Sequence, residues 1–477
     1  MKLIRNYIYN MSYNVLILLT PLLTVPYISR VLGPYGVGVN ATTNSIITYF
    51  LLLGTVGITI YGNREIAFIR EDKVKRSKVF WEIEFLQIMT ITFAYLLFLV
   101  YLFYQKQFRM YFFYQSFLVI AGAFDVSWYF MALEDFRKTV TRNVLVKLAS
   151  LIAIFTLVRN SNDIGTYILI ISLSQLLGNM TLWPYLRHSV LSPIAMKLRP
   201  FHHLLPSISL FIPQVAIQIY LALNKTMLWK LDSVTAAGFF DYSDKLIKLV
   251  LAIVTATGIV MLPRIANLFA KHDLKKVRMY TYNSFDFALF ISIPMAFGIA
   301  GVATTLAPWF FGQHFASVNT LLMIESPVIV LIGLSNVIGQ QYLLPTKQTK
   351  VYTYSVTLGA IVNVVLNIPL IIVWGVQGSM WATVFSELTV TVYQLVIVRR
   401  QLHIKKLFVN CWKYLFSGVL MFSVVYMLNV AMKITVFSLS LQIIEGLLIY
   451  FGCMLILQPS ILKHVPVIFG NRGRKKH

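Results

Sequence analysis

Residues 86–104 read LQIMTITFAYLLFLVYLFY, and residues 164–182 read IGTYILIISLSQLLGNMTL. Both runs are uncharged and largely apolar over their 19 residues. A helix of this length rises 1.5 Å per residue and crosses a bilayer core of about 30 Å. The strands of a membrane barrel instead alternate apolar and polar residues in runs of about 10. These two runs therefore predict helices that span a membrane.

The composition extends this prediction to the whole chain. Hydrophobic residues make up 58% of the 477 positions and charged residues only 12%. An ordinary soluble domain has about 25% charged residues and about 45–50% apolar ones. Lipid must therefore cover part of the surface, where backbone groups have to be satisfied within helices. The two cysteines, Cys411 and Cys453, lie in apolar stretches and predict no disulfide framework.

Apolar runs between polar, glycine or proline breaks predict an all-α membrane protein with about fourteen transmembrane helices. Their expected bounds are 8–30, 39–62, 81–104, 111–133, 143–158, 164–186, 204–224, 234–262, 279–303, 318–343, 351–373, 376–398, 408–430 and 437–457. The basic residues indicate their orientation. Thirty Lys and Arg residues fall on the side that holds both termini, and only a handful fall on the other, among them Lys106, Arg109, Arg159, Lys225 and Lys230. By the positive-inside rule, both termini are expected in the cytoplasm. The same bias explains the net charge of +24 without a nucleic-acid partner.

A shift of about 200 residues aligns the two halves of the chain. Gly38 meets Gly238, and Gly57-Ile58 meets Gly258-Ile259. Internal repeats of this kind are common in transporters. We therefore expect a six-helix lobe over residues 1–200, a second six-helix lobe over 201–400, and two additional helices with a basic cytoplasmic tail over 401–477.

Two motifs resemble those of a known group. Residues 24–38 read TVPYISRVLGPYGVG, and residues 125–134 read DVSWYFMALE. They resemble the first-loop and fourth-helix motifs of Wzx-like polysaccharide flippases, which belong to the multidrug/oligosaccharidyl-lipid/polysaccharide exporter superfamily. The resemblance implies two lobes around a cavity that opens alternately to each side of the inner membrane. It also implies an undecaprenyl-pyrophosphate-linked oligosaccharide as cargo, for O-antigen, capsule or exopolysaccharide assembly.

The eighth predicted helix carries the densest intramembrane charge: Asp241, Asp244, Lys245 and Lys248. Charge inside a span is costly, and it is functional by default. One interpretation is that the two lysines meet the pyrophosphate of the cargo. The other is that the charges form two i,i+4 pairs that neutralise one another in a wet interior. The matching segment of the first half, residues 40–48, is also polar, and this similarity predicts a shared hydrophilic cavity.

Further charged or aromatic residues are candidates for binding or coupling. Arg30 and Lys225, at the outer ends of the first and seventh helices, could contact an anion or simply lie at the interface. Asp125 could bind sugar hydroxyls or a coupling ion while Trp128 stacks on a sugar ring, or Asp125 could bond a neighbouring helix. The remaining intramembrane acids are candidates for binding H+ or Na+, and they are Asp286, Glu325 and Glu387.

We find no catalytic constellation, no pair of histidines with metal-ligand spacing and no ATP-binding phosphate loop in the sequence. The leading hypothesis is thus a transporter without a cofactor, which works in the inner membrane and whose expected partners are a polymerase and a chain-length regulator of the same pathway. Three alternatives stay open: a cation-coupled multidrug antiporter, a lipid II flippase, and a membrane polysaccharide polymerase or ligase.

Overall fold

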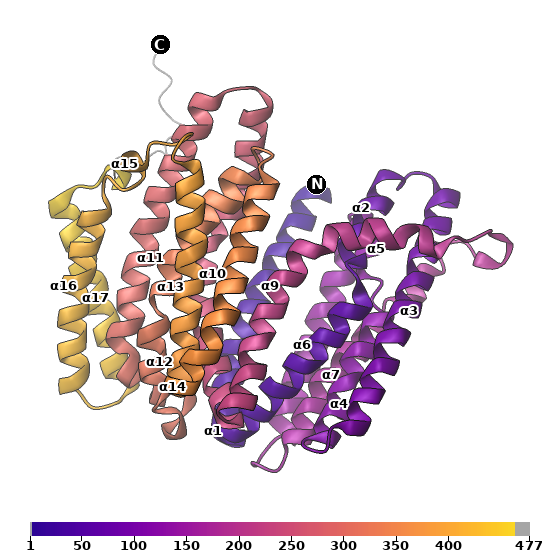
Figure 1. Ribbon diagram of the computed structural model, residues 1–477, viewed down its shortest axis with the longest axis horizontal. Coiled ribbons are helices and arrows are strands. Elements are labelled where there is room, and N and C mark those ends of the chain that lie inside the picture. Colours follow the sequence, from indigo (N-terminus) through magenta and orange to yellow (C-terminus); the bar gives the residue numbers. More distant parts are fainter. Residues whose placement is uncertain (1, 463–477) are drawn as a thin grey trace. The chain divides into compact units, whose positions relative to one another are not determined.

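The computed structural model describes residues 2–462, and every regular element in that range is a helix (Figure 1). The predicted all-α membrane fold is confirmed. The predicted basic tail, from residue 463 onward, lies outside the described residues. Contacts along the chain define two compact units, Met1–Gly238 and Phe239–His477.

Eleven segments of the described chain are long and apolar enough to cross a membrane. Two of them, Leu19–Phe68 and Thr349–Val398, are 50 residues long, about twice the length that a bilayer requires. Each contains a glycine with positive φ, 66° at Gly33 and 57° at Gly375. Glycine adopts this backbone at no steric cost, so it can divide a long apolar segment into two helices. With both halves counted separately, and with α9 (Leu204–Leu231), the structure contains all fourteen predicted helices.

Among the described residues of the first unit, two hydrophobic cores hold the helices together. One of them joins the second half of α1 to α3, α4 and α9, and it includes Ile47, Phe98 and Phe112. The other joins α2, α3, α5 and the α7–α9 connection around Phe80 and Trp128. The elements of this unit are α1 (Lys2–Thr55), α2 (Ile58–Phe68), α3 (Lys73–Tyr104), α4 (Arg109–Ala123), α5 (Ser127–Ala132), α6 (Phe136–Leu157), α7 (Ile164–Met180), α8 (Trp183–Leu186), η1 (Pro193–Ala195), η2 (Pro200–His203) and α9.

In the described part of the second unit, a continuous core lies between α10, α11, α13, α14, α16 and α17. Its elements are most of α10 (Val234–Ala270), α11 (Leu274–Phe311), η3 (Gln313–Phe315), α12 (Val318–Glu325), α13 (Pro327–Asn336), η4 (Val337–Leu343), α14 (Thr349–Val398), α15 (Ile404–Leu407), α16 (Cys411–Ala431) and α17 (Val436–Leu457). The η4 segment is a π-helix, a wide turn that is often found at functional sites. The element before η4 is α13, which begins at Pro327. This proline marks the boundary between α12 and α13.

Two helices begin earlier than hydropathy predicts, because each continues into water until a side chain caps it. The carboxylate of Asp72 accepts backbone hydrogen bonds from Val74 and Lys75 at the start of α3. The carboxylate of Asp273 accepts one from Lys276 at the start of α11. The backbone N–H of Lys75 lowers the pKa of Asp72, and the ammonium group of Lys276 lowers that of Asp273. The caps are 201 positions apart, which is the shift that aligns the two halves.

Candidate functional site

The site begins with a charged face on α10. Lys245 Nζ lies 2.5 Å from Asp241 Oδ2, and Lys248 Nζ lies 2.6 Å from Asp244 Oδ2. Both are i,i+4 pairs with the acid first, the favourable order on a helix. The carboxylates are the more enclosed partners: the Asp241 side chain is 5% exposed, whereas the Lys245 and Lys248 side chains are 42% and 40% exposed. In each pair, the aspartate is the more enclosed side chain, and the lysine that it binds remains partly exposed.

A third acid reaches this face from another helix. Glu325 ends α12 and is fully buried. It lies near enough to Asp244 and Lys248 to interact electrostatically with both. The cluster therefore contains three acids and two lysines, with a formal charge of −1. One monovalent cation would neutralise it. We call Asp241, Asp244, Lys245, Lys248 and Glu325 the α10 cluster.

Aromatic side chains hold the α10 cluster in place. Lys245 Nζ lies 5.1 Å from the centre of the Tyr242 ring, within the range of a cation–π interaction. Tyr242 is 2% exposed. Its ring stacks on Phe311 and Phe315, with centroid distances of 5.6 Å to each. These rings come from α11 and η3, so packing between elements fixes the direction in which Lys245 points.

The structure places the fourth-helix motif differently from the sequence prediction. Asp125 lies in a break between α4 and α5, where its Oδ1 accepts a hydrogen bond from the backbone N–H of Ser127 at 3.0 Å. Trp128 is fully buried. Its ring stacks on Phe80 at 5.5 Å and covers Gly62, where an added Cβ would come within 2.6 Å of the indole. The ring therefore has no free face for a sugar in this conformation.

A buried acid beside Asp125 escaped the sequence analysis. Glu84, on α3, is fully buried, and neither of its carboxylate oxygens has a hydrogen-bond partner among the described residues. Asp125 is close enough to act on it electrostatically. Two glutamates, Glu82 and Glu84, stand near the start of an apolar run. That signal was available in the sequence, but it does not distinguish an interfacial acid from a buried one.

Asp286 joins helices together. It accepts hydrogen bonds from Tyr414 Oη at 2.9 Å and from Asn410 Nδ2 at 3.0 Å, and Ser460 Oγ lies 3.3 Å away. These partners precede, lie within and follow the C-terminal pair α16–α17. Tyr450 on α17 adds a hydrogen bond to the Phe290 carbonyl at 2.9 Å. The carboxylate thus anchors the two additional helices to α11. Because these hydrogen bonds occupy its lone pairs, few lone pairs are left to bind a coupling ion.

The other predicted residues are dispersed. Arg30 is exposed, and its guanidinium donates to the Pro26 carbonyl one turn earlier on α1 at 3.0 Å. Lys225 is half-buried on α9. Glu387 is buried on α14, where it is 7% exposed. Each of the three stays a separate candidate.

Much of the polar face at residues 40–48 is used for packing within the first unit. Thr43 Oγ1 bonds Gln115 on α4 at 3.4 Å. Ser45 and Tyr49 both bond Thr226 on α9, at 3.0 and 3.1 Å. Asn44 and Thr48 remain half-buried on the same helix. The hydroxyl-rich segment therefore serves in part to fasten α1 to its neighbours.

Three hydrogen-bonded side chains lie where η2 meets α9, and we call them the polar relay: Glu82, His203 and Tyr61. His203 Nε2 lies 3.1 Å from Glu82 Oε2, and His203 Nδ1 lies 2.8 Å from Tyr61 Oη. Glu82 Oε1 also accepts the backbone N–H of Arg199 at 2.9 Å. All three side chains of the relay are buried. The relay ties α2, α3 and the start of α9 together, and no local sequence pattern predicts it.

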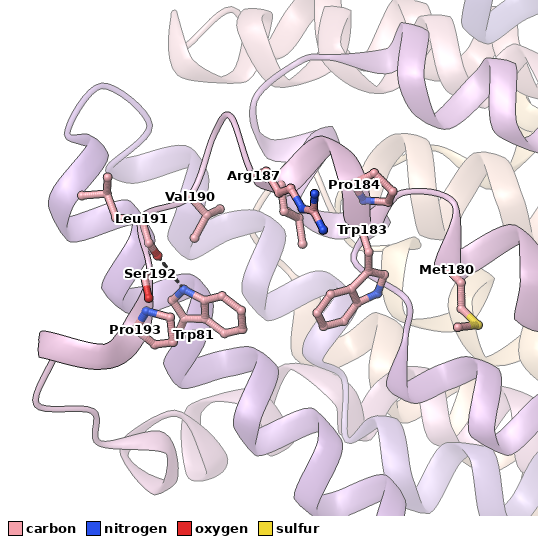
Figure 2. A pocket seen from close by; sticks show the side chains of 10 residues that line it. Trp81, Met180, Trp183, Pro184, Arg187, Val190, Leu191, Ser192 and Pro193 are labelled. Carbon is pink, nitrogen blue, oxygen red and sulfur yellow. Dashed lines mark hydrogen bonds between the residues drawn. The ribbon is translucent and has the colours of Figure 1, made fainter.

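The first unit also contains a pocket of about 590 Å³ beside α8 (Figure 2). The indole rings of Trp81 and Trp183 face it, and Arg187 lies beside Trp183. Trp81 Nε1 donates to the Leu191 carbonyl at 2.8 Å, and Trp183 Nε1 donates to the Phe124 carbonyl at 3.0 Å. Hydrogen bonding therefore holds both rings in position. Among the described residues, no group of His, Cys, Asp and Glu side chains is arranged to hold a metal ion.

A multi-pass helical bundle with a charged cluster inside its spans defines a membrane protein of the transporter class. Solved structures share this fold. The lipid II flippase MurJ in an inward closed conformation aligns with a TM-score of 0.69 over 98% of this chain and all of that one, at 17% identity. An inward-facing multidrug resistance transporter of the MATE family aligns with a TM-score of 0.57 over 85% of this chain and 98% of that one, at 12% identity.

Sequence comparison assigns the family. The profile of the polysaccharide biosynthesis protein family matches residues 3–269, more than half of the chain, and the chain belongs to that family. Two curated relatives carry the name "Putative O-antigen transporter". The one from Shigella dysenteriae is 22% identical over 80% of this chain and 96% of its own length. The one from Escherichia coli (strain K12) is 24% identical over 80% and 93%. The predicted resemblance to polysaccharide flippases is confirmed.

Proposed function

We propose that this protein is a flippase that moves an undecaprenyl-pyrophosphate-linked oligosaccharide from the cytoplasmic to the outer leaflet of the inner membrane. The product would feed O-antigen, capsule or exopolysaccharide assembly, with a polymerase and a chain-length regulator acting later. The α10 cluster is the observation that carries the proposal, since it places two lysines within a membrane span. Relatives named as O-antigen transporters support the class of cargo. The distribution of Lys and Arg favours cytoplasmic termini.

In the proposed mechanism, Lys245 and Lys248 are the contacts for the pyrophosphate. Lysine is a compact point charge with three rotatable donors, and it can exchange one oxygen partner for another. Each Nζ now faces a carboxylate, and each side chain is about two-fifths exposed. A pyrophosphate that approaches from the open side could take over these donors. Release would restore the Lys–Asp pairs, so the site need not remain charged and unpaired between cycles.

The same cluster is where we place cation coupling. Its formal charge is −1, and a buried charge without compensation is unstable. A proton or Na+ taken up at Glu325 and Asp244 would neutralise the excess and leave the lysines available for the cargo. The coupling ion would thus favour cargo binding through charge balance, without direct contact between the ion and the cargo.

Replacing Glu325 by Gln tests this coupling. The variant keeps the shape of the side chain and removes the excess negative charge, so transport should lose its dependence on an imposed H+ or Na+ gradient. The measurement is uptake of a lipid-linked oligosaccharide analogue into proteoliposomes with and without each gradient. Glu445→Gln, on α17, is the matched control and should retain the wild-type dependence. Coupling at Glu325 is refuted if the Glu325→Gln protein responds to the gradients as the wild type does.

Deleting the gene tests the function as a whole. A flippase mutant should accumulate lipid-linked repeat units at the cytoplasmic face and lose surface polysaccharide, because the later steps act outside. The measurement is lipid extraction followed by mass spectrometry, with accessibility to an external glycosidase reporting the leaflet. The MATE-like fold makes a drug antiporter the relevant competitor. If the mutant instead keeps its polysaccharide and becomes sensitive to cationic drugs, the antiporter is the better assignment.

A further inference from the structure

A second pocket in the first unit, of about 620 Å³, includes Tyr185 of α8 in its lining and shares no lining residue with the one in Figure 2. It is formed where α6 begins and α7 ends. Its lining includes Arg137, Lys138 and Arg142 from α6, with Tyr185 from α8 and Leu145 one turn further along α6. The backbone N–H groups at the start of a helix, and its dipole, also favour an anion at this end.

The acids in this pocket already have cationic partners. Asp135 Oδ2 lies 2.9 Å from Lys138 Nζ, and Glu134 Oε1 lies 2.9 Å from Arg70 Nη1. Lys138 Nζ is held further by the Phe130 and Tyr185 rings, at 5.0 and 5.4 Å. The net formal charge of the lining is +1, from three cations and two acids. The positive charge available to a ligand therefore comes mainly from the two arginines.

Arg137 and Arg142 are held differently. Arg137 is exposed, and it forms no hydrogen bond or ion pair with another described residue. Arg142 is half-buried, and its Nη1 donates to Asn179 Oδ1 on α7 at 2.6 Å. One guanidinium is thus fixed against α7, and the other is free to move onto a ligand. A pair of guanidinium groups matches a phosphate through charge-assisted hydrogen bonds.

The pocket adjoins a face of α6 that is suited to lipid chains. Leu145, Leu148 and Ile152 follow one another along the helix and are 61%, 44% and 62% exposed. Only 11% of the most apolar window of α6 is buried, the lowest share among the eleven spans. A lipid whose acyl chains lie along this row would bring its phosphate to the level of the pocket. Basic pockets between membrane helices are known as sites for anionic headgroups.

We propose that this pocket binds the phosphodiester headgroup of an anionic phospholipid, such as phosphatidylglycerol, as a ligand separate from the cargo. Its volume corresponds to a drug-sized molecule, which fits a phosphoglycerol group and is small for an oligosaccharide with its pyrophosphate. A phosphodiester also brings one negative charge close to Glu134 and Asp135, whereas a pyrophosphate brings at least two. A bound phospholipid would hold α6 against α7 through Arg142.

Lipid-dependent thermal stability tests this assignment. The full-length protein, purified in neutral detergent, is titrated with phosphatidylglycerol, with phosphatidylcholine, with a polyprenyl pyrophosphate and with inorganic phosphate, and its melting temperature is followed. We expect a saturable rise with phosphatidylglycerol and none with phosphatidylcholine or inorganic phosphate. A rise with the polyprenyl pyrophosphate reflects cargo binding at the α10 cluster and should be unchanged in Arg137→Gln. Arg137→Gln should weaken the apparent affinity for phosphatidylglycerol about fivefold, because one Lys or Arg contributes about 1 kcal/mol at an anionic lipid surface. Arg142→Gln should weaken it at least as much.

Arg159→Gln is the matched control. It removes an arginine at the opposite end of α6, where the side chain bonds the Thr156 carbonyl, and the phosphatidylglycerol response should be unchanged. Arg142→Gln can also disturb folding through Asn179, so the exposed Arg137 is the decisive position. A rise of the same size with phosphatidylcholine would overturn the proposal. So would a rise with polyprenyl pyrophosphate in place of phosphatidylglycerol, or a wild-type phosphatidylglycerol response in Arg137→Gln.

Discussion

Replacing both Lys245 and Lys248 by alanine is expected to abolish surface polysaccharide while the protein accumulates normally in the membrane. A hydrogen bond that involves a charged group contributes about 1.5–3 kcal/mol. The loss of two such contacts with the cargo therefore corresponds to roughly a hundredfold or more in binding. The measurement is surface polysaccharide in a deletion strain that carries the variant, normalised to an immunoblot of the membrane fraction.

The structure supplies a close control for this experiment. Lys276 also pairs with an aspartate in the second unit, with its Nζ 2.7 Å from Asp273 Oδ2, but the pair lies at the start of α11 outside the apolar run. Lys276→Ala should leave polysaccharide at the wild-type level.

The alanine replacements at Lys245 and Lys248 also leave Asp241 and Asp244 without their lysines, which could unfold the protein and so remove polysaccharide for a reason unrelated to cargo binding.

A second variant removes that ambiguity. Combining Asp241→Asn and Asp244→Asn with Lys245→Gln and Lys248→Gln keeps polar partners at all four positions but removes the charges. We expect a normal amount of protein and no polysaccharide. A quadruple variant that still makes normal polysaccharide would refute a role for the two lysines in binding cargo. The function would then rest on the family and its relatives rather than on this cluster.

Replacing Gly38 by Val is expected to prevent most of the protein from folding. Gly38 on α1 faces Val234 at the start of α10, and a Cβ at Gly38 would lie 1.9 Å from the Val234 carbonyl oxygen. On the opposite helix, a Cβ at Gly238 would lie 2.5 Å from the Pro34 carbonyl oxygen. The helices pack backbone to backbone, as small residues allow in membranes. A larger residue must force them apart, at a cost at or above the upper end of the about 1–3 kcal/mol usual for overpacking.

Thermal unfolding of the purified protein in detergent, together with its yield from the membrane, measures this effect. Gly452 is a suitable control, because it lies within α17 and, apart from its chain neighbours and the nearby backbone of α17, no atom of the described residues comes within 4 Å of the position of its Cβ. Gly452→Ala should keep the wild-type melting temperature or raise it slightly. A Gly38→Val protein that is obtained in normal yield and melts with the wild type would show that the close approach of α1 and α10 is not needed for stability.

The helices themselves were largely predictable, because a membrane makes a long apolar run sufficient for a span. The breaks within them were harder to predict. Hydropathy treats residues 111–133 as one span, but the structure interrupts it around Asp125, whose side chain caps the next turn. Residues 318–343 likewise divide into α12, α13 and a π-helix. An apolar run shows where lipid lies, but it contains no information about where the backbone leaves helical geometry.

The candidate site was predicted in part for a related reason. The pairs Asp241–Lys245 and Asp244–Lys248 lie on one helix, where a spacing of four residues brings side chains together whatever else surrounds them. Glu325 was expected only as an isolated acid, yet it meets the same cluster from α12. Trp128 and Asp286 show the opposite outcome. Packing against Phe80 encloses the first. Tyr414 on α16, Asn410 just before α16 and Ser460 after α17 donate the hydrogen bonds to the second.

The sequence by itself determined the class of the protein, its fourteen helices and the charged face of α10. Each of these follows from composition or from spacing along a single helix. Both properties can be read from the order of the residues alone. The tertiary structure alone decided which acids meet those charges, which aromatic rings are enclosed and where α1 and α10 touch. Such contacts join residues that are tens to hundreds of positions apart, and only the packing of whole helices brings them within bonding distance.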